Sequence, residues 1–479
     1  MPGIWKPLTN QPPALPSGAT FNAESMILLT DGSVLVHHAY GAEWMRLQPD
    51  AGGSYTAGIW SSAGTMNNSR QYFASGVLRD ARVFAIGGED SSAGGDTPLG
   101  EMYDPLTDSW SALAKPAAFD WIKGDASSCV LPDGKVVLGA LDDARTAVWD
   151  PHANHWREAG TAFGTQPATK VGRTNEETWT LLRDGTVLTV DTFDAPAAER
   201  YLPHEDIWIS AGSTPQSLID AAMFEIGPAI LLPDHRVFAI GGAPYTAVYT
   251  PGHNGQPGAW SDGPVMQDSS GNPLGANDAP AVLLPSGRVL CCGGLRHPEG
   301  NPPQYWTGPT LFFEYDGEAN AVTPTATQPS INGGDTWTAR LMLLPSGEAL
   351  YTAQGPEIWV YTPDGAPRHE WRPRITECAR HLHRGESYKI EGHRLTGLSQ
   401  AVSYGDDYTA ATNYPLVRLR SGSTVAYYRT YDFSTFAVAT GERRIEARFE
   451  VPASAPSGQG ELRVVANGIE SEPVHVHVH

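Results

Sequence analysis

Pairs of short apolar runs, each joined by a tight turn, recur along the chain. The clearest copy is Asn277–Gly294, with an acidic residue (Asp278), an apolar run (Ala281–Leu284), a Pro-Ser-Gly turn and a second run (Val289–Cys292). Two such runs joined by a glycine-containing turn predict a β-hairpin. Six further copies lie at Glu24–His38, Tyr72–Gly88, Asp125–Gly139, Glu177–Asp191, Glu225–Gly242 and Thr338–Ala353.

A third run follows each hairpin and ends in a turn signal such as Met102–Pro105. A fourth run often carries a tryptophan, and these are Trp60, Trp110, Trp156, Trp208 and Trp260. Their spacing of about 50 residues is typical of kelch-type propellers. Four antiparallel strands per repeat predict the blades of a β-propeller.

The two ends of the repeat predict how the ring closes. The seventh unit, Thr338–Gly365, supplies three strands, and no comparable fourth strand follows it. Such a strand stands at the start of the chain instead, at Gly3–Pro7, and resembles Gly58–Trp60. We therefore expect seven blades closed by the N-terminal strand, which leaves only short sheet edges.

The repeat ends near Pro367, and a different pattern follows from Arg368. Short alternating strands with turn signals over about 110 residues predict an immunoglobulin-like β-sandwich. The expected organisation is an all-β chain with a propeller over 1–367 and a sandwich over 368–479. Two long insertions, Gln267–Asn277 and Arg296–Thr310, are expected to be loops that could shape a binding mouth.

Composition and charge narrow the classes of partner. The 479 residues carry a net charge of −21, which disfavours sequence-independent binding to nucleic acid or anionic lipid. Cations, amines, neutral sugars and a protein partner remain compatible. No apolar run reaches 18 residues, so no membrane span is expected.

The N-terminus lacks the apolar core of a signal peptide, which indicates a cytoplasmic protein as written, or an extracellular one if this is a mature form. Of the four cysteines, Cys291 and Cys292 are adjacent on a strand, where a mutual disulfide would be strained. We interpret them as buried small hydrophobic residues.

Several segments resemble the galactose oxidase/glyoxal oxidase family and its kelch-like relatives. They are the hairpin Gly124–Gly134 and, in the last domain, Tyr404–Asp407, Ala411–Pro415 and Ser434–Val438. The resemblance implies a C-terminal sandwich that packs on the propeller and sends a loop toward its axis. It also implies one copper ion held by two tyrosines and two histidines, with one tyrosine crosslinked to a cysteine.

The residues aligned with that copper site differ from the family's ligands. Tyr72 stands in place of the cysteine, Asp125 in place of the radical tyrosine, Trp337-Thr338 in place of the tyrosine-histidine pair, and Phe436 in place of the last histidine. Copper prefers imidazole, thiolate or phenolate donors. We therefore expect no copper-radical oxidase activity and no cofactor, with Ca²⁺ as the one open candidate.

Carboxylates occupy the corresponding position of five blades. Glu24, Asp125, Glu176 or Glu177, Glu225 and Asp278 stand roughly seven to nine residues before a hairpin turn, where an innermost strand begins at the axis. Carboxylates that converge repel one another unless a cation or a basic group joins them. Oxygen-only ligands suit Ca²⁺, with Glu24, Asp125, Glu225 and Asp278 as candidates.

Three other interpretations of this rim stay open. A sugar or amine could bind between the acids and the nearby rings of Tyr72, Trp121, Trp179, Trp337 and Phe436. Asp125, Glu177 or Glu225 could act as a general acid or base in an enzyme of changed chemistry. The acids could instead hydrogen-bond between blades and hold the ring together, in a propeller that serves as a protein-interaction platform.

The remaining polar motifs are less specific. His475, His477 and His479 alternate, so they would share one face of a strand, either as a transition-metal site or as a solvated face. His37-His38 and His381/His383 show no partner pattern. Arg70, Arg173, Arg296 and Arg340 are expected to neutralise the acidic rim, and Asp406-Asp407 to form a turn.

Overall fold

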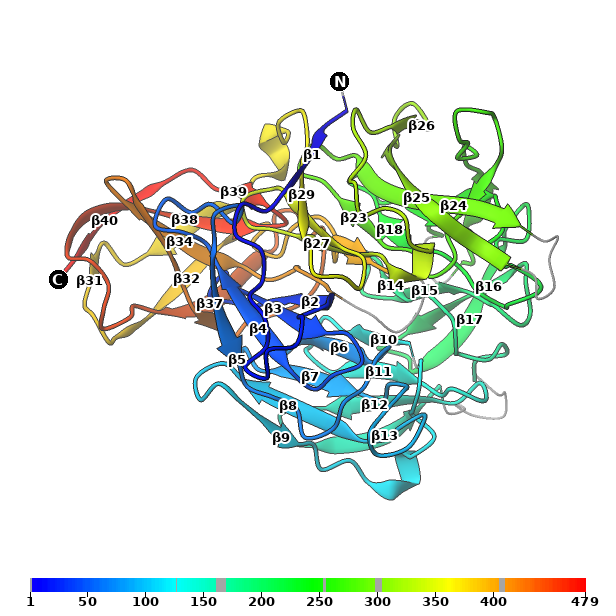
Figure 1. Ribbon diagram of the computed structural model, residues 1–479. Coiled ribbons are helices and arrows are strands. Elements are labelled where there is room, and N and C mark those ends of the chain that lie inside the picture. Colours follow the sequence, from blue (N-terminus) through cyan, green and yellow to red (C-terminus); the bar gives the residue numbers. More distant parts are fainter. Residues whose placement is uncertain (1, 126, 161–168, 253–255, 298–303, 405–409) are drawn as a thin grey trace.

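The computed structural model of the chain is all-β (Figure 1). It describes residues 2–125, 127–160, 169–252, 256–297, 304–404 and 410–479. Within these ranges the helices are three single 3-10 turns, η1 (Ala117–Phe119), η2 (Thr336–Thr338) and η3 (His369–Trp371). No helix in the described part of the chain is long and apolar enough to cross a membrane.

Seven antiparallel sheets form the propeller, which confirms the predicted fold. Blades one to three comprise β2 (Ala23–Leu28), β3 (Val34–His38), β4 (Trp44–Gln48) and β5 (Ile59–Ala63); β6 (Ala74–Val77), β7 (Val83–Ile86), β8 (Gly100–Asp104) and β9 (Ser109–Ala112); and β10 (Ser128–Val130), β11 (Val136–Gly139), β12 (Thr146–Asp150) and β13 (His155–Ala159). Blades four and five comprise β14 (Thr180–Leu181), β15 (Val187–Val190), β16 (Ala197–Leu202) and β17 (Ile207–Ser213); and β18 (Ala229–Leu231), β19 (Val237–Ile240), β20 (Thr246–Thr250) and β21 (Ala259–Asp262). Blades six and seven comprise β23 (Ala281–Leu283), β24 (Val289–His297), β25 (Gln304–Asp316) and β26 (Ala321–Pro324); and β27 (Arg340–Leu343), β28 (Ala349–Thr352) and β29 (Trp359–Thr362).

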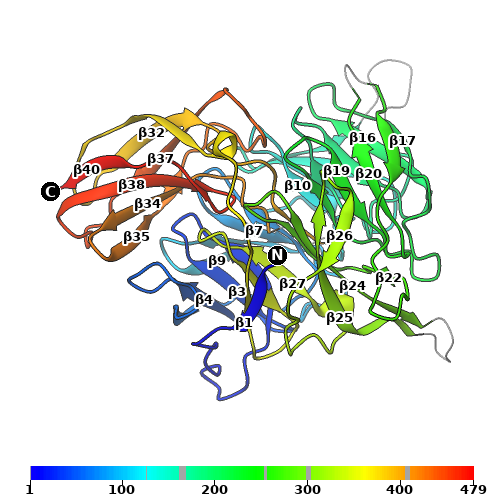
Figure 2. The same cartoon turned by 90° about the horizontal axis from the view of Figure 1, so that it is seen from above.

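The N-terminal strand β1 (Ile4–Pro7) closes the ring as predicted. It pairs antiparallel with β29 in the register Ile4↔Thr362 to Pro7↔Trp359. Figures 1 and 2 both show β1 beside the last blade. Trp5 is buried and its ring lies 4.8 Å from Phe312, 4.9 Å from Tyr361 and 5.5 Å from Tyr351, so the closing strand is held by aromatic packing as well as by backbone pairing.

The two predicted insertions differ in how regular they are. Within the first lies β22 (Leu274–Gly275), which pairs with β24. In the second, β24 and β25 continue as a paired ribbon as far as His297↔Gln304, and residues 298–303 lie outside the described residues. The first insertion is thus mostly loop, as expected, whereas the described part of the second extends the hairpin of β24 and β25 beyond the blade.

The C-terminal strands form two sheets beside the ring, as Figure 2 shows. One contains β30 (Arg374–Cys378), β32 (Ser387–His393), β36 (Thr430–Tyr431) and β37 (Arg444–Glu450). The other contains β31 (His381–Leu382), β34 (Leu416–Ser421), β35 (Thr424–Tyr428), β38 (Gly458–Ala466), β39 (Ile469–Glu470) and β40 (Val474–Val478). The domain boundary after residue 367 itself stays a prediction.

One short strand of this C-terminal part enters the propeller. Strand β33 (Val402–Ser403) pairs with β23, the innermost strand of blade six. The Tyr414 hydroxyl donates a hydrogen bond to the Leu28 carbonyl of blade one. The C-terminal chain thus contacts the innermost strands of two blades that are not adjacent in the ring.

The core follows the apolar runs of the repeat. The inner strands of each blade are buried on both faces, because neighbouring blades cover them. Cys291 and Cys292 are fully buried on β24 as free thiols, and burial raises the pKa of Cys291 to about 12. Both behave as the small hydrophobic residues that the sequence indicated.

Candidate functional site

Three carboxylates from successive blades converge at the inner edge of the propeller. One oxygen each of Glu176, Glu225 and Asp278 lies within 4.8 Å of the other two, and all three side chains are partly buried. They stand just before β14, β18 and β23, and β18 packs against both of the other strands. Among the described residues this is the one such convergence of three or more His, Cys, Asp and Glu side chains.

Two of these acids have the same kind of backbone bend. Glu176 and Asp278 each precede the glycine of their hairpin turn, Gly185 and Gly287, by nine residues. Both acids have left-handed backbones, with φ of 57° and 44°. Non-glycine residues in this region cost about 1 kcal/mol or more and cluster at functional sites. Glu176 and Asp278 thus share the same bend at the same position of their repeats.

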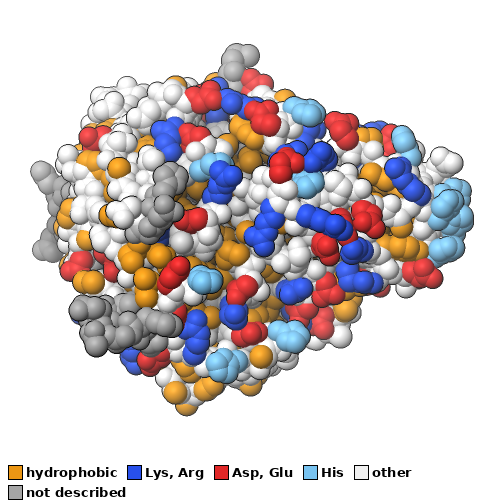
Figure 3. All heavy atoms as spheres, turned by 180° about the vertical axis from the view of Figure 1, so that it is seen from behind, with side chains coloured by type: hydrophobic (Ala, Val, Ile, Leu, Met, Phe, Trp, Pro, Cys, Tyr) orange, Lys and Arg blue, Asp and Glu red, His pale blue; other side chains and the backbone are white. Residues whose placement is uncertain are grey.

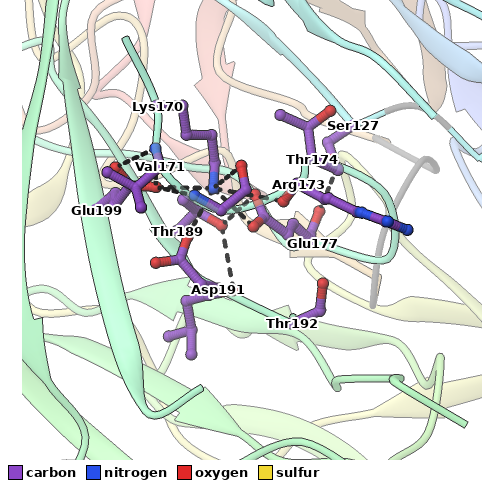
Figure 4. A network of polar contacts seen from close by, with 12 residues as sticks. Ser127, Lys170, Val171, Arg173, Thr174, Glu177, Thr189, Asp191, Thr192 and Glu199 are labelled. Atoms are coloured by element: carbon purple, nitrogen blue, oxygen red, sulfur yellow. Dashed lines mark hydrogen bonds and ion pairs between the residues drawn. The ribbon is translucent and has the colours of Figure 1, made fainter. Parts of the chain in front are cut away.

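Glu177 lies one residue farther along and belongs to a different, fully buried cluster (Figure 4). The Lys170 ammonium lies 2.8 Å from Glu177, 2.6 Å from Asp191 and 3.0 Å from Glu199. Trp179 Nε1 also donates to Glu177 at 3.0 Å. Because its oxygens are satisfied inside the blade, Glu177 is a structural residue, and the acid that faces the convergence is Glu176.

The charges of this cluster shift its pKa values. Burial and the neighbouring Glu177 raise the pKa of Asp191 to about 8. Burial would lower the pKa of Lys170, but the three carboxylates outweigh it and raise that pKa. One lysine cannot balance three carboxylates, so a proton is retained within the cluster.

Glu24 is also committed to the interior. Its carboxylate lies 3.0 Å from His37 Nδ1 and 3.2 Å from the Arg340 guanidinium, and all three side chains are fully buried. Burial alone would raise the pKa of Glu24, but the hydrogen bond from His37 and the charge of Arg340 lower it overall. Arg340 thus neutralises an acid, as predicted, while Arg70 instead pairs with Glu101 at 3.0 Å.

The other predicted site residues lie in several places. Tyr72 is partly buried, accepts a hydrogen bond from Gln354 Nε2 and lies 5.6 Å below the Arg340 guanidinium. Asp125 is partly buried before β10 and is not part of the convergent group. Trp337 lies in η2, with its Nε1 donating to Asp335 at 3.3 Å. Trp179 is buried against Trp208. The Arg145 guanidinium lies 4.8 Å from the centre of the Trp121 ring.

Phe436 does not lie where the alignment placed it. It is buried, and its backbone N–H donates to the Pro132 carbonyl, in the turn at the opposite end of β10 from Asp125. The segment that reaches the inner strands is Val402–Tyr404, where the Tyr404 hydroxyl donates to the Trp337 carbonyl at 2.8 Å. The predicted Asp406-Asp407 turn, next along this segment, lies outside the described residues, as does the Arg296 side chain.

An aromatic pair that includes Phe224, the neighbour of Glu225 in the sequence, was not predicted. Phe193 and Phe224 stack with ring centroids 4.7 Å apart and planes 8° apart, and Phe224, next to Glu225, is 42% exposed. The Arg173 guanidinium lies 4.8 Å above Phe193. Phe224 also has a left-handed backbone, with φ of 64°, and this contact between two blades leaves no short-range sequence signal.

The described side chains at the positions aligned with the implied copper ligands make other contacts. Thr338 donates its hydroxyl to the Asp335 carbonyl, and Tyr72 is the one phenol among the aligned positions. His37 is turned to Glu24 and to the Gly41 carbonyl, 3.0 Å from each. The converging donors are carboxylate oxygens. Hard cations favour such oxygen ligands, whereas copper favours imidazole and thiolate.

Comparisons with known proteins bear on the fold. No protein-family model matches the sequence, and no curated protein matches it. A solved structure of a fungal alcohol oxidase of the AA5 family, in complex with copper, is 14% identical, with a TM-score of 0.57 and 99% of each chain covered. The extracellular domain of a two-component-system protein from B. thetaiotaomicron is 9% identical, with a TM-score of 0.44, 100% of this chain and 58% of that chain covered. At this identity the likeness to the AA5 enzyme shows that the chain has the galactose oxidase-like fold.

Proposed function

We propose that the propeller binds a small polar ligand, of the carbohydrate class, at an acidic mouth that holds a hard divalent cation such as Ca²⁺. The observation that carries the proposal is the convergence of Glu176, Glu225 and Asp278 within 4.8 Å. Two oxygens on the same Ca²⁺ lie at most about 5 Å apart, since each Ca–O distance is about 2.3–2.6 Å. The three acids therefore suit one ion without rearrangement of the backbone.

A neighbouring amide supports an oxygen-rich site. Asn277, the residue before Asp278, is 6% exposed, and its Oδ1 accepts no hydrogen bond from any described group. Amide carbonyl oxygens are ordinary Ca²⁺ ligands. Because Ca²⁺ takes six to eight oxygens, three carboxylates and one amide would leave positions for the hydroxyl groups of a ligand.

The aromatic pair supports the choice of ligand class. Phe224, the residue before Glu225, offers an exposed ring that is stacked on Phe193. Ligand sites commonly combine an apolar or aromatic wall with a few polar groups. A sugar ring has both an apolar face and hydroxyl edges, so it matches a ring on one side and a cation on the other.

Calorimetric titration of the full chain with Ca²⁺ tests the proposal. We expect one binding event that Glu225→Gln and Asp278→Asn each weaken by roughly tenfold or more, which corresponds to about 1.4 kcal/mol. Glu472→Gln, at an exposed residue of the C-terminal sandwich, serves as the matched control and should leave the affinity unchanged.

Titration with monosaccharides in saturating Ca²⁺ tests the ligand class. The wild-type chain should give a heat of binding, and Phe224→Ala should give none. A wild-type chain that binds no Ca²⁺, or variants that bind as the wild type does, would rule the site out.

A further inference from the structure

Four histidines that are far apart in the sequence gather on one edge of the C-terminal sandwich. Strand β31 carries His381, and His383 follows directly; β40 carries His477, and His479 follows directly. The two strands pair in parallel, with His381 opposite His477 and Leu382 opposite Val478. Leu382 and Val478 are buried, so the alternating histidines share the opposite, solvent-facing side.

The rings are close enough to act together. His381 Nδ1 lies 2.9 Å from His479 Nε2. The ring centroids of His383 and His479 are 5.0 Å apart, and those of His477 and His479 are 4.5 Å apart. Figure 3 shows histidine side chains (pale blue) gathered at this edge of the molecule. His479 is thus the common neighbour of the other three rings.

We propose that His381, His383, His477 and His479 form a binding site for a divalent transition metal, with Zn²⁺ or Cu²⁺ as the ion. Imidazole nitrogen is a preferred ligand of both ions. Two nitrogens on one tetrahedral Zn²⁺ lie about 3.4 Å apart, given a Zn–N distance of about 2.1 Å. The nitrogens of His381 and His479, now at hydrogen-bond distance, lie about 0.5 Å closer than that separation. A metal would replace this hydrogen bond, and the His383 and His477 side chains would have to rotate to supply a third or fourth nitrogen.

Several polar and charged residues surround the four histidines. The backbone amide of Arg384 meets the His479 carbonyl, and the Arg380 guanidinium meets the His475 carbonyl. Glu386 accepts from Tyr388, and Glu461 lies opposite His475 on β38. The nearby charged side chains thus include both signs.

Calorimetric titration of the full chain with Zn²⁺, and separately with Cu²⁺, at pH 7.5 tests this site. We expect one ion per chain, and a double variant, His381→Ala with His479→Ala, should weaken binding by more than the about 100-fold that loss of an outer-shell partner costs. His204→Ala removes a 97% exposed histidine of the propeller and should have no effect. Binding should fall steeply below about pH 6, where free histidine protonates.

Two further measurements distinguish this site from metal binding at the acidic mouth and from a loss of folding. Glu225→Gln, at the acidic mouth, should bind Zn²⁺ as the wild type does, because the two sites share no residue. Circular dichroism should show the double variant folded, since its two changes are at exposed side chains. No binding, unchanged binding in the folded double variant, or one ion per two chains with metal-induced dimerisation would overturn a site built within one chain.

Discussion

At the scale of single residues, a shift of one position separates a candidate ligand from a structural group. Glu176 joins the convergent acids, whereas Glu177 is buried against Lys170. Glu24, eight residues before Gly32, is likewise buried, while Asp278 stands nine residues before Gly287. Successive side chains near a strand point to opposite sides, which accounts for the different surroundings of Glu176 and Glu177.

The Lys170 cluster predicts a pH-dependent stability. Asp191, which Lys170, Glu177 and Glu199 face, has its pKa raised to about 8, whereas unfolded aspartate titrates near 3.9. Between these pH values the folded chain keeps a proton that the unfolded chain releases, so this group's contribution to stability falls as the pH rises. Asp191→Asn removes the effect, and its stability relative to the wild type should rise by up to about 1.4 kcal/mol per pH unit.

Urea unfolding at pH 5, 6, 7 and 8 measures that difference. Asp96→Asn, at an exposed aspartate of blade two, is the matched control and should run parallel to the wild type. Parallel curves for Asp191→Asn and the wild type would contradict the pKa assignment.

At the scale of elements, the ring depends on a strand from the far end of the chain. Strand β1 supplies the fourth strand of blade seven. Its Trp5 fills a pocket between Phe312 of blade six and Tyr361 of its own blade. The Gly3 amide also donates to Glu314, whose carboxylate accepts from the Tyr361 hydroxyl at 2.5 Å. The closing strand therefore joins two blades at once.

Trp5→Ala should lower the free energy of unfolding by about 3–5 kcal/mol, the usual cost of removing a buried tryptophan. Trp110→Ala removes the matching residue of β9, which is buried in blade two, away from the closure. Chemical denaturation of both variants and the wild type measures the difference. Equal losses for the two variants would show that closure adds nothing beyond ordinary burial.

At the scale of the whole molecule, the C-terminal sandwich and the propeller are connected through β33. Pairing of Val402 with Val282 extends the sheet of blade six with a C-terminal strand. Thr178 of blade four donates to the Tyr404 carbonyl at 2.9 Å, and Gln400 Oε1 accepts from the Leu181 amide at 2.9 Å. Unfolding of the sandwich would therefore break backbone pairing within the ring.

We expect the two parts to unfold in one cooperative transition. Trp371 is the single tryptophan after residue 367, so tryptophan fluorescence reports mainly on the propeller. Amide hydrogen exchange of β34, β37 and β38 reports on the sandwich. Coincident denaturation midpoints for the two probes would support coupling, and separate midpoints would show that the sandwich unfolds alone.

The sequence by itself determined the architecture. Seven hairpins with the same pattern of apolar runs and turns predicted seven blades, and the displaced tryptophan strand predicted closure by β1. The alternating strands after Arg368 predicted the sandwich. These features could be predicted because hydrophobic periodicity and turn residues act over short stretches, and because each repeat gives the same signal again.

Only the tertiary structure decided which side chains meet. It brought Glu176, Glu225 and Asp278 together, and it placed Phe436 at a hairpin turn. It also stacked Phe193 on Phe224, and it set His381 opposite His477 across nearly a hundred residues. Such contacts depend on how blades and strands pack in three dimensions, where one residue of register turns a side chain from one face to the other.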